Sequence, residues 1–454
     1  MKYNEYDTDD MIAALATPWG ESALAVIRTS GDGCIDTISP FFRGRETLAS
    51  AGGYTMHYGK LVDPHTGNEL DQIVAGVYRK PKSYTGQDMV EIFCHGSMPG
   101  ITGILDGLRS TGFRDASPGE FTLRAFLNGK MDLTGAEAVN EIIKAKSPQA
   151  MSLALERLSG SVYNSINSIK TLVSGILAEI ELQLDYAEDE ADPEAVLSIG
   201  KIETAVLRLE KLSSTYRIGK VIQEGVKAVL TGRTNAGKSS LFNLLNRAER
   251  AIVSEYHGTT RDYIESLLVI GGIPVKLYDT AGIRVSDHPV ESEGIKKSTE
   301  VIEVSDIIIY LVDGSDGVTD EDRIRLDYFD RKKLVKVWNK SDISTKEIPD
   351  GFIAVSSLTG SGLDKLEKEI AARIGAENIT LDDKAVIDSQ RQKKLIDDAH
   401  VSLENSLSAI RANMPLDVVA VDIRDALDSL GEITGEITTA DILELMFSRF
   451  CVGK

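Results

Sequence analysis

GRTNAGKS, at residues 232–239, joins an apolar run that predicts a strand, residues 226–230, to a segment that predicts the start of a helix, residues 239–245. A loop in this position can wrap its backbone N–H groups around a polyphosphate, because its two glycines lack a Cβ atom. We expect Lys238 to contact the β- and γ-phosphates and the Ser239 hydroxyl to bind Mg²⁺. A glycine-rich turn could match this spacing by chance, but the flanking strand and helix are what a phosphate-binding loop requires.

The region around this loop alternates short apolar runs with helical segments. Over residues 225–375 that alternation predicts a parallel, doubly wound α/β sheet. Gly271 and Gly272 separate the first two runs after the loop and predict a hairpin turn. The strands expected after the loop are residues 265–270, 275–279, 307–312, 334–338 and 352–355.

A second motif, Asn339-Lys340-Ser341-Asp342, follows one of the predicted buried strands. The Asp342 carboxylate can accept hydrogen bonds from N1–H and the 2-amino group of guanine. Adenine has no donor at N1, so this contact selects guanine. The backbone N–H groups of Ser356-Ser357-Leu358 can approach guanine O6.

Two further motifs supply groups for the phosphates and for magnesium. In Asp279-Thr280-Ala281-Gly282 the carboxylate can hold Mg²⁺ through water, and the last N–H can reach the γ-phosphate. Thr260, in the stretch GTTRD at residues 258–262, is the candidate second hydroxyl ligand of Mg²⁺. Four motifs in this order predict a guanine-nucleotide-binding domain.

The residue after the third motif is Ile283, where many small GTPases have a glutamine that orients the attacking water. An isoleucine side chain cannot hydrogen-bond to water. Hydrolysis therefore needs a water-positioning group and a charge stabiliser from elsewhere in the chain. Glu291 and Glu293, in the segment that follows, are candidates, and a solvated acidic surface is the alternative explanation for both.

The composition limits the class of protein and its partners. The 454 residues carry a net charge of −20, so contact with RNA phosphates must be local or shared with a partner. Three cysteines, far apart in the sequence, indicate a reducing compartment without a disulfide framework. The N-terminus lacks an apolar signal core, and the longest apolar run, residues 307–312, is too short to span a bilayer. We therefore expect a cytoplasmic protein without membrane contact.

The flanks of the nucleotide domain differ from each other in pattern. Residues 1–120 mix predicted strands, at 22–28, 72–78 and 89–94, with a helix at 99–108, which indicates an α+β domain. Residues 121–224 and 376–454 are helical and predict one helical domain interrupted by the inserted domain 225–375. Apolar side chains at helical spacing are Leu155, Leu158, Val162, Ile166, Ile169, Val173, Ile176 and Ile180 in the first part, and Leu395, Ala399, Leu403, Leu407 and Ile410 in the second. Thr438-Thr439-Ala440-Asp441 predicts the cap of a last helix with Ile442, Met446 and Phe450 on its apolar edge.

Together with its flanks, the chain resembles the MnmE (TrmE) family of tRNA-modification GTPases. Besides the nucleotide motifs, the resemblance includes SYTG at 83–86, PGEF at 118–121, RAFLNGK at 124–130 and the C-terminal CVGK at 451–454. It implies an N-terminal tetrahydrofolate-binding domain, a helical domain and an inserted Ras-like G domain. It also implies dimerisation through the N-terminal domains and a heterotetramer with the FAD-dependent MnmG (GidA) protein. In that family the complex modifies carbon 5 of the wobble uridine of tRNA, using a 5,10-methylene or 5-formyl tetrahydrofolate.

The resemblance also implies roles for individual residues. It places folate contacts at Arg28, Glu91, Lys130 and Lys454, since cations suit the glutamate tail and a carboxylate suits the N–H edge of the pterin. It assigns a potassium ion to Asn235 with main-chain carbonyls near Ser254, Tyr256 and Thr259, where the ion replaces an arginine finger. Glu291 corresponds to the water-positioning glutamate, and Cys451 to a cysteine that the modification requires. The complete set of expected GTP-binding residues is Asn235, Ala236, Gly237, Lys238, Ser239, Ser240, Ser254, Thr259, Thr260, Asp279, Thr280, Ala281, Gly282, Asn339, Lys340, Asp342, Ser356, Ser357 and Leu358.

Two departures and two rival functions accompany this resemblance. Thr234 stands where the family usually has proline, and Val452 where isoleucine is commoner. A regulatory Era-like switch in ribosome assembly would need a basic RNA-binding domain after the G domain, but that region is acidic and helical here. A dynamin-like assembly module would need a membrane-binding stretch, and the sequence offers none.

Overall fold

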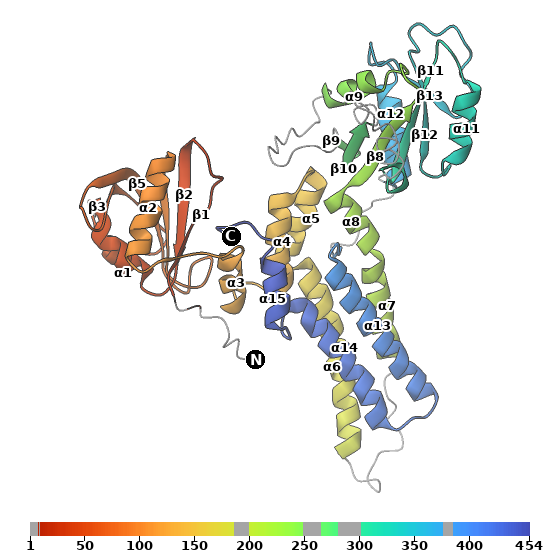
Figure 1. Cartoon of the computed structure of the whole chain (residues 1–454). Coiled ribbons are helices and arrows are strands. Elements are labelled where there is room, and N and C mark those ends of the chain that lie inside the picture. The colour runs from red at the N-terminus through yellow and green to blue at the C-terminus, as the bar shows by residue number, and fades with distance from the viewer. Residues whose placement is uncertain (1–7, 9, 186–198, 248–264, 280–300, 376–384) are drawn as a thin grey trace, which may run out of the picture. The chain divides into compact units, whose positions relative to one another are not determined.

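The computed structural model describes residues 8, 10–185, 199–247, 265–279, 301–375 and 385–454 (Figure 1). The chain folds into two compact units. The first unit comprises residues 1–140, 157–207 and 398–454, and the second comprises residues 141–156 and 208–397. The domain boundaries expected from the sequence stay predictions. Among the described residues, no helix has both the length and the apolar character that crossing a bilayer requires.

The first unit contains a seven-stranded sheet with the strand order β3-β4-β5-β6-β2-β1-β7. Strands were expected at 22–28, 72–78 and 89–94, and all three exist with slightly longer bounds. The strands are β1 (Ile12–Leu15), β2 (Ser22–Ser30), β3 (Phe42–Gly44), β4 (Thr55–Val62), β5 (Glu69–Tyr78), β6 (Met89–Gly96) and β7 (Arg114–Asp115). All neighbours pair antiparallel except β1 and β7.

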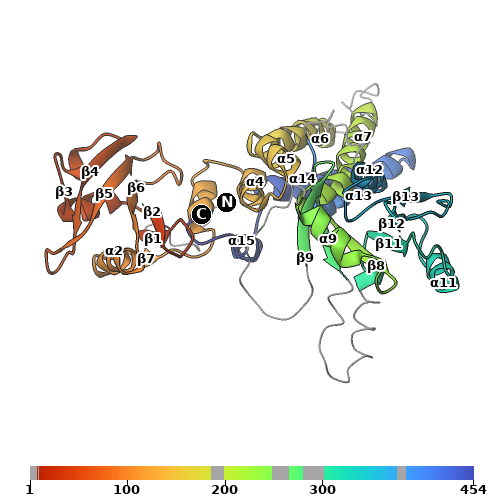
Figure 2. The ribbon, with the colours of Figure 1, turned by 90° about the horizontal axis from the view of Figure 1, so that it is seen from above.

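The two faces of this sheet differ because side chains alternate along each strand. One face is the core of the unit, where Ile27, Ile73 and Ile92 pack with the buried side of α2 (Met98–Ser110). Figure 2 shows α2 beside this sheet. The other face exposes large side chains. Tyr54, directly before β4, and Met56 and Tyr58, within it, are each more than 60% exposed.

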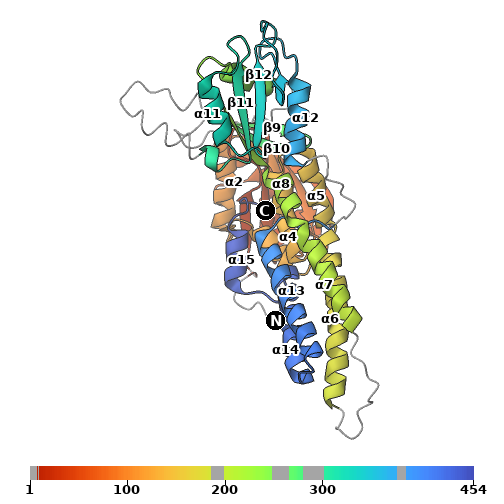
Figure 3. The same ribbon diagram turned by 90° about the vertical axis from the view of Figure 1, so that its right-hand side faces the viewer.

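Helices make up the rest of the first unit. The long helices α6 (Ser161–Asp185) and α14 (Leu416–Thr434) run side by side (Figures 1 and 3). Helix α3 (Glu120–Leu127) and helix α15 (Ala440–Phe447) share a small apolar cluster. Among the described helices, those with residues in both units are α4 (Leu133–Lys144), α5 (Pro148–Leu158), α7 (Ile199–Ser214) and α13 (Gln390–Arg411).

Two expected helix faces need correction. Val162 to Ile180 are buried as expected, but Leu155 and Leu158 are 44% and 41% exposed. The helical conformation is interrupted at Gly160, whose φ is 90°. Helices α5 and α6 are therefore separate, and the buried face of one does not continue in the other. In α15 the buried side chains are Leu443 and Phe447 rather than Ile442 and Met446, although Thr439 caps the helix as expected and Phe450 is buried.

The second unit is built on a six-stranded sheet with the order β13-β12-β11-β8-β10-β9. Its pairs are parallel except that β9 joins β10 through the expected Gly271-Gly272 hairpin and runs antiparallel at the edge. Helices α9 and α12 contribute to the apolar cluster on one face, and α11 contributes to the cluster on the other. The elements are α8 (Tyr216–Glu224), β8 (Val226–Gly232), α9 (Lys238–Arg247), β9 (Glu265–Ile270), β10 (Ile273–Asp279), β11 (Ile307–Asp313), α11 (Asp320–Tyr328), β12 (Leu334–Asn339), β13 (Phe352–Ala354) and α12 (Leu363–Ile374).

Candidate functional site

The glycine-rich loop connects β8 to α9, as its sequence predicts. The Lys238 ammonium donates to the main-chain carbonyls of Gly232 at 2.9 Å and Arg233 at 2.6 Å, so it lies inside the curve of the loop. Gly237 has a φ of 93°, and a Cβ atom there would lie 2.1 Å from Nδ2 of Asn339. Glycine is therefore required at this position by both conformation and space. Asn235 is exposed with a left-handed φ of 64°.

Asn339 ties three of the predicted motifs together. Its Nδ2 donates to the carbonyl of Ala236 at 2.7 Å, and its Oδ1 accepts from the backbone N–H of Ser357 at 3.1 Å and from the Ser357 hydroxyl at 2.7 Å. Because the side chain is 1% exposed, these bonds are made away from bulk water. The base-recognition segments and the phosphate loop are thereby held in one site.

Of the other predicted guanine-binding residues, some are fixed by contacts within the protein and others are exposed to solvent. Lys340 has a left-handed φ of 59°, and its ammonium pairs with Asp313 at 2.5 Å. Asp342 and Leu358 are exposed, and Ser356 is buried. Asp313, which the sequence analysis did not single out, is the last residue of β11 and lies opposite Asn339 in the register. A polar residue at the carboxyl end of a central strand was the available signal.

A hydroxyl and a carboxylate lie where magnesium is expected. Ser239 donates through Oγ to Oδ2 of Asp279 at 3.2 Å, and Asp279 is buried at the end of β10. Mg²⁺ prefers such oxygen ligands, so these two residues fit the ion. Outside the described residues lie the other expected nucleotide, magnesium, potassium and water contacts, namely Ser254, Tyr256, Thr259, Thr260, Thr280, Ala281, Gly282 and Glu291.

In the first unit, three of the four expected folate residues come together. Arg28 donates through Nε to Oε1 of Glu91 at 2.8 Å and through Nη1 to the carbonyl of Gly453 at 2.9 Å, and its Nη2 forms an ion pair with the same Glu91 oxygen at 2.8 Å. Burial, followed by the charge of Arg28, lowers the pKa of the neighbouring Lys454 amine, while the charge of Glu91 opposes this shift. A cationic pair and a carboxylate thus share one small region.

Lys130 belongs to a neighbouring loop. Its ammonium donates to the carbonyl of Pro81 at 3.0 Å, and its stem passes Gly86. Within the described part of the chain, no contact joins Lys130 to Arg28 or to Glu91. The Arg28 guanidinium lies 5.7 Å from the ring centre of Tyr84, on the same loop as Pro81 and Gly86.

The C-terminal tail is fixed to the sheet. Gly453 has a φ of 89°, and a Cβ atom there would lie 2.8 Å from Cα of Ala16. The backbone N–H of Gly119 donates to the carbonyl of Cys451 at 3.3 Å. The thiol of Cys451 is exposed, whereas burial raises the pKa of Cys34 to about 12 and of Cys94 to about 11. Of the three thiols, Cys451 is the accessible one.

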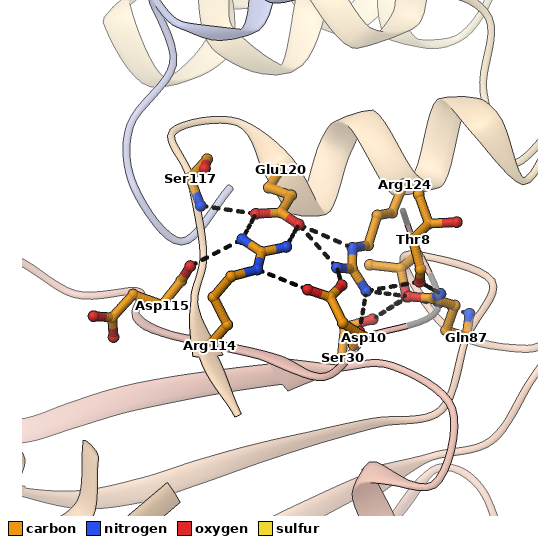
Figure 4. Close-up of polar contacts among 10 residues, drawn as sticks. Thr8, Asp10, Ser30, Gln87, Arg114, Asp115, Ser117, Glu120 and Arg124 are labelled. Carbon is orange, nitrogen blue, oxygen red and sulfur yellow. Dashed lines mark hydrogen bonds and ion pairs between the residues drawn. The ribbon is translucent and has the colours of Figure 1, made fainter. Parts of the chain in front are cut away.

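Two sequence motifs of the first unit form a polar network that the sequence analysis did not foresee (Figure 4). Arg124, fully buried on α3, bonds Glu120 and Asp10, and its Nη1 also donates to the carbonyls of Thr8 and Asp10 and to the side chain of Gln87. Arg114 forms a two-point ion pair with Glu120, with distances of 2.9 and 2.7 Å. The network connects α3 to the N-terminal segment and to the 83–87 loop.

Comparison with known proteins agrees with these features. The profile of the MnmE helical domain matches residues 133–451, and that of the GTP-binding protein TrmE N-terminus matches residues 11–130. The tRNA modification GTPase MnmE of Borreliella burgdorferi is 41% identical, with 99% of each chain covered. The proteins of the same description from Carboxydothermus hydrogenoformans and Enterococcus faecalis are 39% and 38% identical, with at least 98% of each chain covered. The chain therefore belongs to the MnmE family.

Proposed function

We propose that this chain is a GTPase that acts in the modification of tRNA. The observation that carries the proposal is the Asn339 side chain, which joins the phosphate loop to the segments expected around guanine. The full-length relatives named tRNA modification GTPase support the second half of the proposal. The alternative, an Era-like switch in ribosome assembly, would have the same kind of nucleotide site but would not modify tRNA.

The test changes guanine recognition and follows tRNA. In Asp342→Asn the amide cannot accept both guanine donors, and a hydrogen bond to a charged group contributes about 1.5–3 kcal/mol. We expect GTP binding to weaken by about 10- to 100-fold, measured by titration with a fluorescent GTP analogue. In cells that lack the protein, mass spectrometry of tRNA nucleosides should show wobble uridines without the modification at carbon 5. The parent gene should restore the modification and Asp342→Asn should not. Normal nucleosides in the deletion strain would favour the ribosome-assembly function.

Magnesium would be held by Ser239 and by Asp279 through water, with Thr260 as a further hydroxyl ligand. When bound, the ion neutralises charge on the β- and γ-phosphates. Lys238 would exchange its bonds to the loop carbonyls for bonds to those phosphates. The backbone N–H groups of the loop would then donate to the phosphates.

We infer that hydrolysis uses Glu291 and potassium in place of the missing glutamine. Asn235 would hold the ion with main-chain carbonyls near Ser254, Tyr256 and Thr259, and its exposed, left-handed position leaves its side chain available. Glu291→Ala should keep GTP affinity within about twofold and lower the hydrolysis rate by at least 100-fold, because removal of one water-orienting or charge-stabilising group costs about 10²–10³ in rate. Hydrolysis by the parent should be faster in KCl than in NaCl of equal concentration. Equal rates in the two salts would remove the ion from the mechanism.

The first unit would bind the folate and the second copy. Arg28, Glu91, Lys454 and Lys130 form the proposed site for a 5,10-methylene or 5-formyl tetrahydrofolate, and Cys451 would take part in the modification. The family resemblance implies a homodimer, which sedimentation velocity would reveal. The FAD-dependent MnmG protein would join this dimer as a heterotetramer in the cytoplasm, and FAD would reside on that partner. Copurification of the two proteins tests the assembly.

A further inference from the structure

Four side chains form a continuous row across the outer face of the first sheet. In the strand register, Arg28 of β2 lies opposite Glu91 of β6, and Glu91 lies opposite Gly76 of β5. The ring of Tyr78 lies over Gly76, with its hydroxyl 3.5 Å from where a Cβ atom of residue 76 would be. The same Tyr78 hydroxyl donates to Oε2 of Glu91 at 3.2 Å. The Tyr54 ring meets the Tyr78 ring edge to face, with centres 5.7 Å apart.

The backbone of Tyr54 adopts a conformation that is unfavourable for an aromatic residue. Its φ is 61°, in the left-handed region that glycine and asparagine adopt far more readily than an aromatic residue. Its N–H donates to the carbonyl of Val77 at 2.7 Å, which fixes this conformation, yet the residue is 67% exposed. A strained residue that buries so little of its ring within the fold is typical of a functional surface.

Glu91 has limited capacity to accept further hydrogen bonds. An ionised carboxylate offers about four acceptor positions. A hydrogen bond from Nε and an ion pair with Nη2 of Arg28 occupy Oε1, and one hydrogen bond from Tyr78 occupies Oε2. About one position remains accessible to a ligand, and it is on Oε2, the oxygen that accepts from Tyr78. A ligand N–H that reaches this oxygen therefore brings its ring system close to the aromatic end of the row.

We propose that Tyr54 and Tyr78 belong to the site centred on Arg28 and Glu91: Tyr54 stacks a flat heteroaromatic ring of the ligand, and Tyr78 is a positioning residue for the Glu91 carboxylate. The inference rests on the proposed folate function and adds to it the surface that selects a planar, N–H-bearing ring. The ligand donates to Oε2 of Glu91 and places a face of its ring against the exposed Tyr54 ring. Arg28 and Lys454 remain beside the carboxylate for the anionic part of the ligand.

Calorimetric titration of the full-length protein with 5-formyltetrahydrofolate tests the role of Tyr54. Tyr54→Gly removes the ring and the backbone strain together, so we expect binding about tenfold weaker with an unchanged or higher Tm. Tyr54→Phe keeps the ring and should bind within twofold of the parent. Tyr58→Ala removes a ring of β4 that is equally exposed, at 68%, and should bind like the parent.

The outcomes separate this inference from the function on which it rests. If the parent does not bind the folate, the proposed folate function fails and the stacking role fails with it. If the parent binds and Tyr54→Gly binds equally well, the stacking role alone is wrong. If Tyr54→Gly and Tyr58→Ala both weaken binding and both shift sedimentation toward the monomer, the Tyr54 ring belongs to an interface between copies rather than to the ligand site.

A double-mutant cycle tests the role of Tyr78. Its hydroxyl donates to Oε2 of Glu91, so a positioning residue acts on the ligand through that carboxylate. In Tyr78→Phe we expect 5-formyltetrahydrofolate to bind about fivefold more weakly, and in a Glu91→Ala background the same change should have almost no further effect. An equal loss of affinity in both backgrounds would overturn the positioning role.

Discussion

At the scale of single residues, the network around Arg124 shows how a buried charge is accommodated. Arg124 is 0% exposed, and Asp10 and Glu120 supply two carboxylates to it and to Arg114 (Figure 4). Burial raises the pKa of Glu120, but the bonds from Arg114, the Ser117 N–H and Arg124 outweigh it and hold that pKa below its usual range. Burial also raises the pKa of Asp10, and Arg114 and Arg124 reverse the shift in the same way.

Glu120→Gln is the sharpest test of this network. The variant keeps the size of the side chain but leaves Arg124 with less compensating charge, and breaking a buried ion pair costs about 3–5 kcal/mol. We expect the first unit to lose about 3 kcal/mol at pH 7 in urea unfolding. Because the folded pKa of Glu120 lies below the unfolded value of about 4.3, its contribution is complete above about pH 5 and disappears as the pH falls through the folded pKa. The difference between parent and variant should shrink below about pH 4.

An exposed ion pair of the same unit provides the matched control. Asp106, 62% exposed, pairs with Arg109 on α2. Surface pairs of this kind contribute about 0–1 kcal/mol, so Asp106→Asn should change stability by less than about 1 kcal/mol. A Glu120→Gln variant as mild as this control, or a difference that does not change with pH, would show that the buried network is not a source of stability.

At the scale of elements, the sequence predicts those strands and helices whose apolar pattern is long and local. The clearest buried strand of the second sheet, β11 (Ile307–Asp313), was found because six apolar residues follow one another in it. Strands β1, β3, β4 and β7 were not predicted. Three of them, β1, β3 and β7, have four, three and two residues, and β1 exists through pairing with distant residues, such as Ile12 with Arg114. The longer β4 carries Met56 and Tyr58 on its exposed face, so its apolar residues do not mark a buried side.

The nucleotide site was predictable for a related reason. Its phosphate loop and its Asn339 motif are each contiguous in the sequence, and each follows a strand whose end places it in the site. Asp313, the partner of Lys340, and Asp10, a partner of Arg124, are far from those residues in the chain, so no local pattern could pair them. Tyr78 and Tyr54 escaped prediction because their roles depend on strand register and on one left-handed φ.

At the scale of the whole molecule, the two units have separate cores and one tryptophan each. The apolar cluster of the first sheet draws only on residues 11–113, and the cluster on either face of the second sheet draws only on residues 221–374. Trp19 is 60% exposed in the first unit. Trp338 is buried in the second unit, where it donates to the Ser344 hydroxyl and meets the Phe352 ring edge to face. Each tryptophan can therefore report the unfolding of its own unit.

This arrangement predicts that the two proposed ligands stabilise different unfolding transitions. A ligand at 100 times its Kd adds about 2.7 kcal/mol to the folded state that binds it. In Trp19→Phe, where Trp338 remains as the reporter, GDP at that excess should move the fluorescence transition in urea upward, and 5-formyltetrahydrofolate should leave it in place. The folate should instead move the fluorescence transition reported by Trp19, which is seen in the parent and is absent in Trp19→Phe. If the folate moves the Trp338 transition as far as GDP does, the units unfold as one, and the separate cores do not act as independent folding units.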